Sequence, residues 1–461
     1  METVFRRKAY DQLLKWKEES EGSSAILING ARRVGKSHLA EAFGKNEYRD
    51  HILINFTKLN PTIRKVFDEY NGDIDDFLRN LSVAIGRTMP ERESLVIFDE
   101  VQLCPKARQM IKFLVEDGRY DYIETGSLLS IKTNIQGIVI PSEEEDLNLF
   151  PMDFEEFLWA LGNETAIPYL KECLNAERPV GEELHRFLMG LFRKYMLVGG
   201  MPQAVKAFVE TGRFEKAETV KREILRTYRK DVARYAKGYE QRVNSIFDNI
   251  PSELNRKDKK FSVTSIGKNA RNREYEDSFL WLSDSMIVNP CVNSTDPRVG
   301  LSMSRDVTTQ KLYMGDTGLL VTQCLDDELD TSEEIYKSLL LGKLGINEGM
   351  FAENVVAQCF RSNGRSLYFY SRSRRAASDE GSEEGIREGW DSPIEIDFLI
   401  RRGRKICPVE VKSSDRINHD SLDRFIERFG KTLGQAYLLC TKDVKRDGDV
   451  LYLPLYMAAI L

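Results

Sequence analysis

The sequence has no long apolar segment. No run approaches the roughly 20 apolar residues that cross a bilayer as a helix. Residues 1–10 are polar and basic and no apolar run follows them, so we expect no signal peptide. The apolar residues 451–461 cover about half of a membrane span and include Pro454, which favours a buried strand with a short tail. These absences predict a cytoplasmic protein without a membrane segment.

Cysteine and histidine are also scarce. The 461 residues include seven cysteines without a CxxC pair and four histidines without an HExxH pattern. The first absence argues against a disulfide framework or a zinc knuckle, and the second argues against catalytic zinc. A reducing compartment fits this composition.

A net positive charge is missing as well. The chain carries 67 Lys and Arg against 73 Asp and Glu, which gives a net charge of −6. No global positive field therefore indicates nucleic-acid binding. Local basic segments occur at residues 222–234, 256–260 and 268–273, and each is either a phosphate- or DNA-binding face or a solvated, charged surface. We expect the acidic run 143–146 to be solvated surface.

The first third of the chain alternates short apolar runs with amphipathic stretches. At about 150 residues per domain, the length favours about three domains. Residues 1–150 predict an α/β domain with a parallel sheet. The expected strands are residues 25–28, 52–56, 95–98, 122–124 and 147–150.

The following region changes to a helical pattern. Residues 151–245 have apolar positions at helical spacing and predict a helical lid or connector, with a turn at Gly199, Gly200 and Pro202. Residues 246–325 predict a winged-helix-like unit. It would consist of short helices near residues 262–269 and 274–283 and a strand at residues 311–314.

The last region, residues 326–461, returns to α/β character. It predicts a helix at residues 348–359 and strands at residues 367–370, 394–400, 405–411 and 436–440. Residues 376–393 are rich in Ser, Gly and Glu, a composition that predicts a surface loop.

One segment matches a phosphate-binding motif in full. Residues 30–37 follow the pattern GxxxxGK[ST] between an expected strand and an expected helix. The glycines let backbone N–H groups wrap around phosphates, and the helix N-terminus faces the same anion. Lys36 is expected on the β- and γ-phosphates of ATP, and the Ser37 hydroxyl on Mg²⁺. The predicted nucleotide-binding residues are Gly30, Ala31, Arg32, Arg33, Val34, Gly35, Lys36, Ser37 and His38.

A second segment supplies carboxylates for the same site. The apolar residues 95–98 end in Asp99 and Glu100, at the carboxyl end of a strand, where open α/β sheets bind ligands. We expect Asp99 to hold Mg²⁺ and Glu100 to polarise the attacking water. The next strand ends near Thr125 and Ser127, and it would lie between the other two strands. Either hydroxyl could sense the γ-phosphate during catalysis, and a plain turn is the alternative.

These motifs, together with later segments, resemble the predicted ATPases of the AAA superfamily in bacteria and archaea. Those proteins join an N-terminal AAA domain to a C-terminal region of unknown function. The likeness covers nearly the whole chain, and it implies an AAA-type sheet, a helical lid, a winged-helix-like middle and a nuclease-like C-terminal fold. Besides the phosphate loop, it rests on FDEVQ at 98–102, TGS at 125–127, FPMDFEEF at 150–157, VGGMP at 198–202 and YMGDTGL at 313–319.

One departure from this family concerns an arginine. AAA proteins that work as rings often carry an arginine finger after the sensor strand, but residues 128–150 contain no arginine. Activation by a neighbouring subunit would then need another residue, and Arg226, Arg229 or Arg234 could substitute.

The C-terminal region contains a second set of charged candidates. Asp397 lies in one expected strand, and Glu410 and Lys412 lie in the next. If the two strands form a hairpin, side-chain alternation brings these three residues to one end of the sheet. With Glu353 from the expected helix, the carboxylates could hold Mg²⁺ while the lysine orients a water.

This pattern resembles the restriction-endonuclease motif PD-(D/E)xK. Ile396 stands where the motif has proline, so the match is incomplete. An ordinary hairpin with charges at its rim is the alternative.

Together these features predict an α/β protein that binds ATP with Mg²⁺, hydrolyses it and could act on nucleic acid. Two alternatives stay open. One is an ATP-gated, metal-dependent nuclease that uses the C-terminal domain, and the other is a non-catalytic, nucleotide-switched module that binds DNA or protein. Beside ATP, the expected partners are DNA, a protein or further copies of the same chain.

Overall fold

The computed structural model describes residues 5–126, 143–268, 270–298, 300–325, 333–340, 348–372, 393–414 and 418–461. Ser127 and residues 376–392 of the predicted surface loop lie outside these ranges. The chain divides into two compact units, Met1–Pro151 with Asp284–Met286, and Met152–Ser283 with Ile287–Leu461. Within the described ranges, none of the helices combines the length and the apolarity that a membrane crossing needs.

The first unit is built on a five-stranded sheet in the order β2-β3-β4-β1-β5, with all pairs parallel. The strands are β1 (Ala25–Asn29), β2 (Asp50–Asn55), β3 (Ser94–Asp99), β4 (Asp121–Gly126) and β5 (Glu144–Asn148). The helices are α1 (Lys8–Ser20), α2 (Lys36–Glu47), α3 (Pro61–Asp68), α4 (Ile74–Ile85) and α5 (Pro105–Asp117), with 3₁₀ turns η1 (Phe56–Lys58) and η2 (Val101–Leu103). The predicted α/β class is confirmed, and β4 lies between β1 and β3 as expected.

The fifth strand differs from its predicted position. The sequence pattern predicted a strand at residues 147–150 and solvated surface at residues 143–146, whereas β5 begins at Glu144. Glu145 and Asp146 are exposed, but Glu144 Oε1 accepts a hydrogen bond of 2.7 Å from Arg108 of α5. Arg108, which is 36 positions away in the chain, therefore pairs with the Glu144 carboxylate, although the local sequence pattern predicted that this residue would be solvated.

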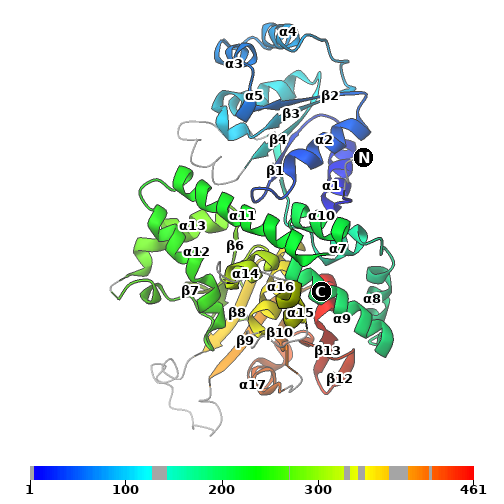
Figure 1. The fold of residues 1–461 in the computed structure, drawn as a ribbon, viewed down its shortest axis with the longest axis vertical. Coiled ribbons are helices and arrows are strands. Elements are labelled where there is room, and N and C mark those ends of the chain that lie inside the picture. Colours follow the sequence, from blue (N-terminus) through cyan, green and yellow to red (C-terminus); the bar gives the residue numbers. More distant parts are fainter. Residues whose placement is uncertain are drawn as a thin grey trace. The chain divides into compact units, whose positions relative to one another are not determined.

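Alternating side chains of this sheet form two separate cores. Ile26 and Ile28 of β1 belong to a core with α1 and α2, which contribute Leu13, Trp16, Leu39 and Phe43. Ala25 and Leu27 belong to a core with α3, α4 and α5, which contribute Phe67, Phe77, Leu81, Met110 and Leu114. Because successive strand residues point to opposite faces, a strand that is apolar throughout needs helices on both sides. The two helix layers flank the sheet in Figure 1.

The second unit begins with helices and ends with a large sheet. Its helices are α7 (Phe154–Ala160), α8 (Ala166–Asn175), α9 (Glu182–Val198), α10 (Pro202–Thr211), α11 (Phe214–Tyr235), α12 (Glu240–Asn255), α13 (Glu276–Asp284), α14 (Thr317–Cys324), α15 (Glu333–Leu340), α16 (Glu348–Ser362) and α17 (Asp420–Phe429). Its strands are β6 (Val288–Ser294), β7 (Arg305–Met314), β8 (Leu367–Arg372), β9 (Ile394–Arg402), β10 (Lys405–Val411), β11 (Ala436–Cys440), β12 (Lys445–Asp447) and β13 (Val450–Pro454). Short 3₁₀ segments are η3 (Val263–Ser265), η4 (Asn272–Tyr275), η6 (Gly430–Thr432) and η7 (Leu455–Ile460).

The helical pattern that the sequence predicts after residue 150 is present as α7 to α11. The helix α7 begins with a capping box, in which Asp153 and Glu156 each bond the backbone N–H of the other. The predicted turn separates α9 from α10. Gly199 in this turn has φ +80°, and a Cβ there would lie 2.2 Å from Asp316 Oδ1, so the position requires glycine.

The middle region differs from the expected winged-helix-like unit. The described residues of this stretch, 262–268, contain only the turn η3, and the strand β6 was not predicted. The strand β6 pairs with β7 on one side and with β8 on the other. The β6–β7 pair is therefore the edge of a single sheet in the order β12-β13-β11-β10-β9-β8-β6-β7. Local pattern could not reveal this, because the pairing with β8 joins segments far apart in the chain.

The predicted helix and strands of the C-terminal region are all present. The strands β8, β9 and β10 form an antiparallel meander after α16, and β11 then pairs in parallel with β10 after α17. Phe360 of α16 packs edge-on against Phe398 of β9, with 5.5 Å between the ring centres. The amphipathic α17 buries Leu422 and Phe425 in a core shared with Ile396 of β9.

Candidate functional site

The phosphate-binding motif folds as a tight loop between β1 and α2. Gly35 has φ +100°, in the left-handed region that favours glycine, and no side chain caps the N-terminus of α2. A Cβ on Gly30 would lie 2.4 Å from the carbonyl oxygen of Leu149, so this position also requires glycine. An uncapped helix N-terminus behind a glycine loop is available to an anion.

The side chain of Lys36 lies inside this loop. Its ammonium donates hydrogen bonds to the carbonyl oxygens of Gly30, at 2.9 Å, and Ala31, at 3.1 Å. Only 8% of the residue is exposed. The backbone thus holds a positive charge at the centre of the loop, where it can bind a phosphate.

Asp99 is the centre of a hydrogen-bond network at the carboxyl ends of the strands. Its Oδ1 accepts from Ser37 Oγ at 2.5 Å and from Thr125 Oγ1 at 2.6 Å, and its Oδ2 accepts from Asn55 Nδ2 at 2.5 Å. The parallel strands β1, β2, β3 and β4 end at the same edge of the sheet, and α2 with Ser37 begins there after β1, which brings these residues together. Their oxygens are the ligands that Mg²⁺ prefers, so the site fits a nucleotide with this cation.

Glu100 follows Asp99 in an uncommon backbone conformation. It has φ 57° and ψ 49°, which only a few per cent of non-glycine residues adopt. Its N–H donates to Thr125 Oγ1 at 3.3 Å, and its Oε2 accepts from Gln102 Nε2 at 2.5 Å. The Thr125 hydroxyl therefore contacts both acidic residues, and backbone strain of this kind is concentrated at functional sites.

The other predicted nucleotide-binding residues differ in exposure. Ala31 and Val34 are buried, so they offer the ligand only their backbone, while the side chains of Arg32 and His38 are exposed. Arg33 adopts φ 66° and helps to turn the loop.

Two residues of this site belong to no sequence motif. Asn55 ends β2 and binds Asp99, and a polar residue at the end of an apolar strand is the signal that could have indicated it. Arg7 precedes α1 and donates hydrogen bonds to Val34 O at 3.1 Å and to Phe150 O at 2.6 Å. Arg7 thus ties the loop to the end of the domain, and no local signal marks it.

The candidates of the C-terminal region gather at the hairpin β9–β10, which pairs antiparallel as predicted. Asp397 Oδ2 accepts a hydrogen bond of 2.9 Å from the N–H of Val411. Glu410 Oε1 lies 2.6 Å from Lys412 Nζ. Burial, followed by the charge of Asp397, raises the pKa of Glu410 to about 7. The same two causes raise the pKa of Glu353, so the three carboxylates share one electrostatic environment.

Two lysines beyond the predicted one face these carboxylates. Lys311 Nζ of β7 lies 2.8 Å from Glu395 Oε1 and 3.6 Å from Asp397 Oδ1. Lys259 forms an ion pair with Glu353. Burial opposes the charge of Lys311, but the neighbouring carboxylates outweigh it and raise the pKa of this lysine. In the part of the chain that the structure describes, no three or more His, Cys, Asp or Glu side chains are grouped to hold a metal ion. The negative charges of this cluster are instead neutralised by ammonium groups.

Three of the segments that carry the family likeness meet in the second unit. The Gly200 N–H donates to Asp316 Oδ2 at 2.5 Å, and the Gly200 carbonyl accepts from Met152 N–H at 2.7 Å. Asp316 also caps α14 by accepting from Leu319 N–H at 3.0 Å. These segments therefore hold α7, the α9–α10 turn and α14 together.

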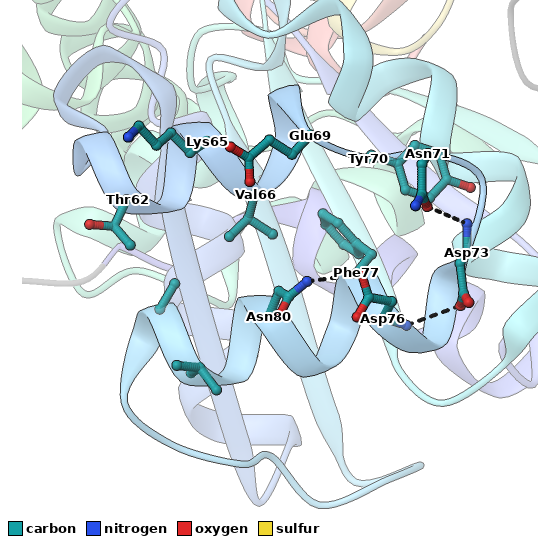
Figure 2. Close-up of a pocket in the computed structure, with 12 residues that line it drawn as sticks. Thr62, Lys65, Val66, Glu69, Tyr70, Asn71, Asp73, Asp76, Phe77 and Asn80 are labelled. Atoms are coloured by element: carbon teal, nitrogen blue, oxygen red, sulfur yellow. Dashed lines mark hydrogen bonds between the residues drawn. The ribbon is translucent and has the colours of Figure 1, made fainter.

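A separate hollow of about 540 Å³ lies between α3 and α4 in the first unit. Figure 2 shows Val66 and Phe77 in its wall. Three of its polar residues bond to one another, since Asp73 Oδ1 accepts from Asp76 N–H at 3.0 Å and Asp76 Oδ2 accepts from Asn80 Nδ2 at 3.1 Å. No residue predicted from the sequence lies there.

Residues 22–158 match the family model described as AAA domain. The first unit therefore has the fold and the phosphate loop of a P-loop domain, and it is similar to the AAA domain. Residues 189–330 and residues 390–457 match two models that are each described as a domain of unknown function, DUF8612 and DUF4143. No curated protein sequence matches the chain.

Several solved structures are similar to the chain. The Walker-type ATPase paby2304 of Pyrococcus abyssi is 16% identical, with 70% of this chain and 96% of that chain covered and a TM-score of 0.43. Cdc6p from Pyrobaculum aerophilum is 13% identical, with 75% and 97% covered and a TM-score of 0.24. A STAND signal transduction ATPase from Pyrococcus horikoshii is 12% identical, with 78% and 48% covered and a TM-score of 0.28, so this chain spans about half of that protein. All three TM-scores are below 0.5, so the similarity to the AAA domain rests on the match of residues 22–158.

Proposed function

We propose that this protein binds ATP with Mg²⁺ at its P-loop and hydrolyses the nucleotide. The observation that carries the proposal is the pair of hydroxyls, from Ser37 and Thr125, that share the buried carboxylate of Asp99. A phosphate-cradling loop beside such a carboxylate is the arrangement that P-loop ATPases use. The match of residues 22–158 to the AAA domain supports the same conclusion.

Each side chain of the site has a proposed role. Lys36 binds the β- and γ-phosphates and stabilises the charge that they develop. Ser37 and Asp99 hold Mg²⁺, which neutralises charge on the phosphate oxygens when it is bound. Glu100 polarises the attacking water. Thr125 contacts both acidic residues, so it can couple the state of the γ-phosphate to them.

Mg²⁺-dependent ATP turnover by the full chain tests this proposal. We expect Lys36→Ala to weaken nucleotide binding and to reduce turnover at least about 100-fold. We expect Glu100→Gln to retain binding while kcat falls by about 10²–10⁴-fold. Lys45→Ala is a matched control, because Lys45 lies on the same helix, is 57% exposed and pairs with Glu41 at the surface. Turnover that survives in Lys36→Ala would exclude hydrolysis at this loop.

A second candidate function is metal-dependent cleavage of nucleic acid by the C-terminal region. Two observations favour it: the convergence of carboxylates and Lys412 at the β9–β10 hairpin, and the order of a helix, an antiparallel meander, a helix and a parallel strand. Lys259 and Lys311 weigh against it, because a cation would compete with these ammonium groups for the same carboxylates.

Incubation with single- and double-stranded DNA and either Mg²⁺ or Mn²⁺ tests cleavage. A nuclease should lose activity in Asp397→Ala and keep it in Asp447→Ala, which changes an exposed aspartate on β12. The absence of cleavage on every substrate would sink this candidate. Nucleotide-dependent binding of DNA without cleavage would favour a nucleotide-switched binding module, and an ATPase rate that rises with DNA would connect turnover to nucleic acid.

A further inference from the structure

A cavity of about 310 Å³ lies between α11, α12 and α14 in the second unit. Its volume is at the lower end of the range found for small-molecule sites, about 300–1,000 Å³. None of its lining residues belongs to the P-loop or to the C-terminal carboxylate cluster. The polar residues that line it are Arg222, Arg226, Arg229, Asp248, Thr322 and Gln323.

The three arginines converge because of their spacing on α11. Positions four and three residues apart lie one helical turn apart on the same face. Carboxylates orient two of them: Arg222 Nε lies 2.8 Å from Glu218 Oε1, and Arg229 Nη2 lies 2.9 Å from Asp248 Oδ1. These two arginines fit the salt-bridged alternative that the sequence left open for residues 222–234, and Arg226 between them does not.

Arg226 and Gln323 have no partners in the described part of the chain. Arg226 is exposed and forms no ion pair or hydrogen bond with a described residue. Both polar atoms of the Gln323 side chain, Nε2 and Oε1, are buried without a hydrogen-bond partner among the described residues. A buried amide that makes no hydrogen bond destabilises a fold, and a polar ligand would supply what it lacks.

The charges of the cavity select an anion. Glu218 and Asp248 compensate Arg222 and Arg229, so the Arg226 guanidinium leaves the cavity with one uncompensated positive charge. Gln323 lies near the C-terminal end of α14, where the helix contributes a partial charge of about −0.5 at most, which is smaller than the positive charge. Guanidinium groups bind phosphate through paired, charge-assisted hydrogen bonds.

We propose that this cavity binds a phosphate-bearing ligand, with Arg226 as the anchoring cation and the Gln323 amide as a polar contact. A free pyrophosphate or the phosphate end of a nucleotide has this chemistry, and so does a backbone phosphate of single-stranded nucleic acid. The hollow between α3 and α4 (Figure 2) supports no comparable proposal, because its lining carries charges of both signs and several of its acidic and amide groups bond to one another.

Calorimetric titration of the full chain tests this site, in a Lys36→Ala background that silences phosphate binding at the P-loop. The probes are pyrophosphate and a short single-stranded oligothymidylate. We expect Arg226→Gln to weaken the binding of at least one probe by about tenfold or more. Lys230→Gln is the matched control, since Lys230 is an exposed cation on the same helix and does not line the cavity. It should leave binding unchanged.

The two probes separate the possible sources of the phosphate. Arg226-dependent binding of pyrophosphate identifies a small phosphate compound, and Arg226-dependent binding of the oligothymidylate alone identifies a strand backbone. Gln323→Met gives a second reading of the site, because it should raise Tm without a probe and reduce the stabilisation that the bound probe produces. Binding that Arg226→Gln leaves unchanged, or no binding of either probe, overturns the proposal.

Discussion

Asp99 receives hydrogen bonds from residues 62, 26 and 44 positions away, namely Ser37, Thr125 and Asn55. Sequence motifs pointed to Ser37 and Thr125, because residues that contact a nucleotide directly recur in recognisable patterns. Asn55 was not predicted, because its hydrogen bond to Asp99 depends on β2 being the neighbour of β3. A single strand pattern carries no information about which strand lies beside it.

A second buried acid, Glu124 of β4, lies one residue before Thr125. It is completely buried, and its Oε2 accepts a hydrogen bond of 2.5 Å from Arg108. Burial raises the pKa of Glu124 to about 7, even though Arg108 acts in the opposite direction. Arg108 also bonds Glu144, so one guanidinium serves two carboxylates.

This raised pKa predicts a pH dependence of stability. An acid whose folded pKa lies above the ordinary value near 4.5 contributes stability fully below pH 4.5 and loses it as pH rises through 7. Relative to Glu124→Gln, we expect the wild-type free energy of unfolding to fall by about 1–3 kcal/mol between pH 5 and 8. Urea unfolding of both proteins at several pH values measures this difference. Parallel pH profiles would contradict the assignment.

At the scale of elements, close backbone contact explains two of the family segments. The α9–α10 turn lies against the first turn of α14, and a Cβ on Gly318 of α14 would lie 2.4 Å from Val198 O and 2.6 Å from Gly199 N. Gly190 of α9, by contrast, has no atom within 4 Å of a built Cβ. The same residue type is therefore required at one position and merely tolerated at the other.

The pair Gly318→Ala and Gly190→Ala tests this contrast. We expect Gly318→Ala to reduce the free energy of unfolding by about 1–3 kcal/mol, because the methyl group would overlap backbone atoms that cannot move away. We expect Gly190→Ala to increase it by about 0.5–1 kcal/mol, because alanine has the higher helix propensity. Denaturant unfolding measures both changes, and effects of equal sign would contradict the close contact.

The molecule as a whole consists of two compact units, and the P-loop lies in the first. Ligand binding stabilises only the part of a protein that folds cooperatively with the site. We expect Mg²⁺-ATP to raise the free energy of unfolding of the first unit alone, by about 2.7 kcal/mol at 100 times its Kd. The unfolding transition of this unit should therefore move to a higher temperature. Scanning calorimetry of the full chain measures this shift, and Lys36→Ala should abolish it. A uniform shift of one single transition would mean that the two units unfold together.

The sequence by itself determined the features that depend on contiguous residues. Strands β1 to β4, the P-loop and the acidic pair after β3 are each formed by contiguous residues. The residue types of the strands suit burial, and those of the P-loop and the acidic pair suit the binding of phosphate and Mg²⁺. The hairpin β9–β10 was also recognisable, because its two strands follow one another with a short turn. Local physical chemistry is sufficient in these cases.

Only the tertiary structure decided the features that join distant parts of the chain. It made β6 and β7 the edge of the C-terminal sheet, brought Lys259 and Lys311 to carboxylates that the motif assigned to a metal, and formed a cavity beside Arg226. The physical reason is common to all of these. Strand order and helix packing bring together residues roughly 75 to 100 positions apart, and the contacts that favour one arrangement exist only once the chain has folded.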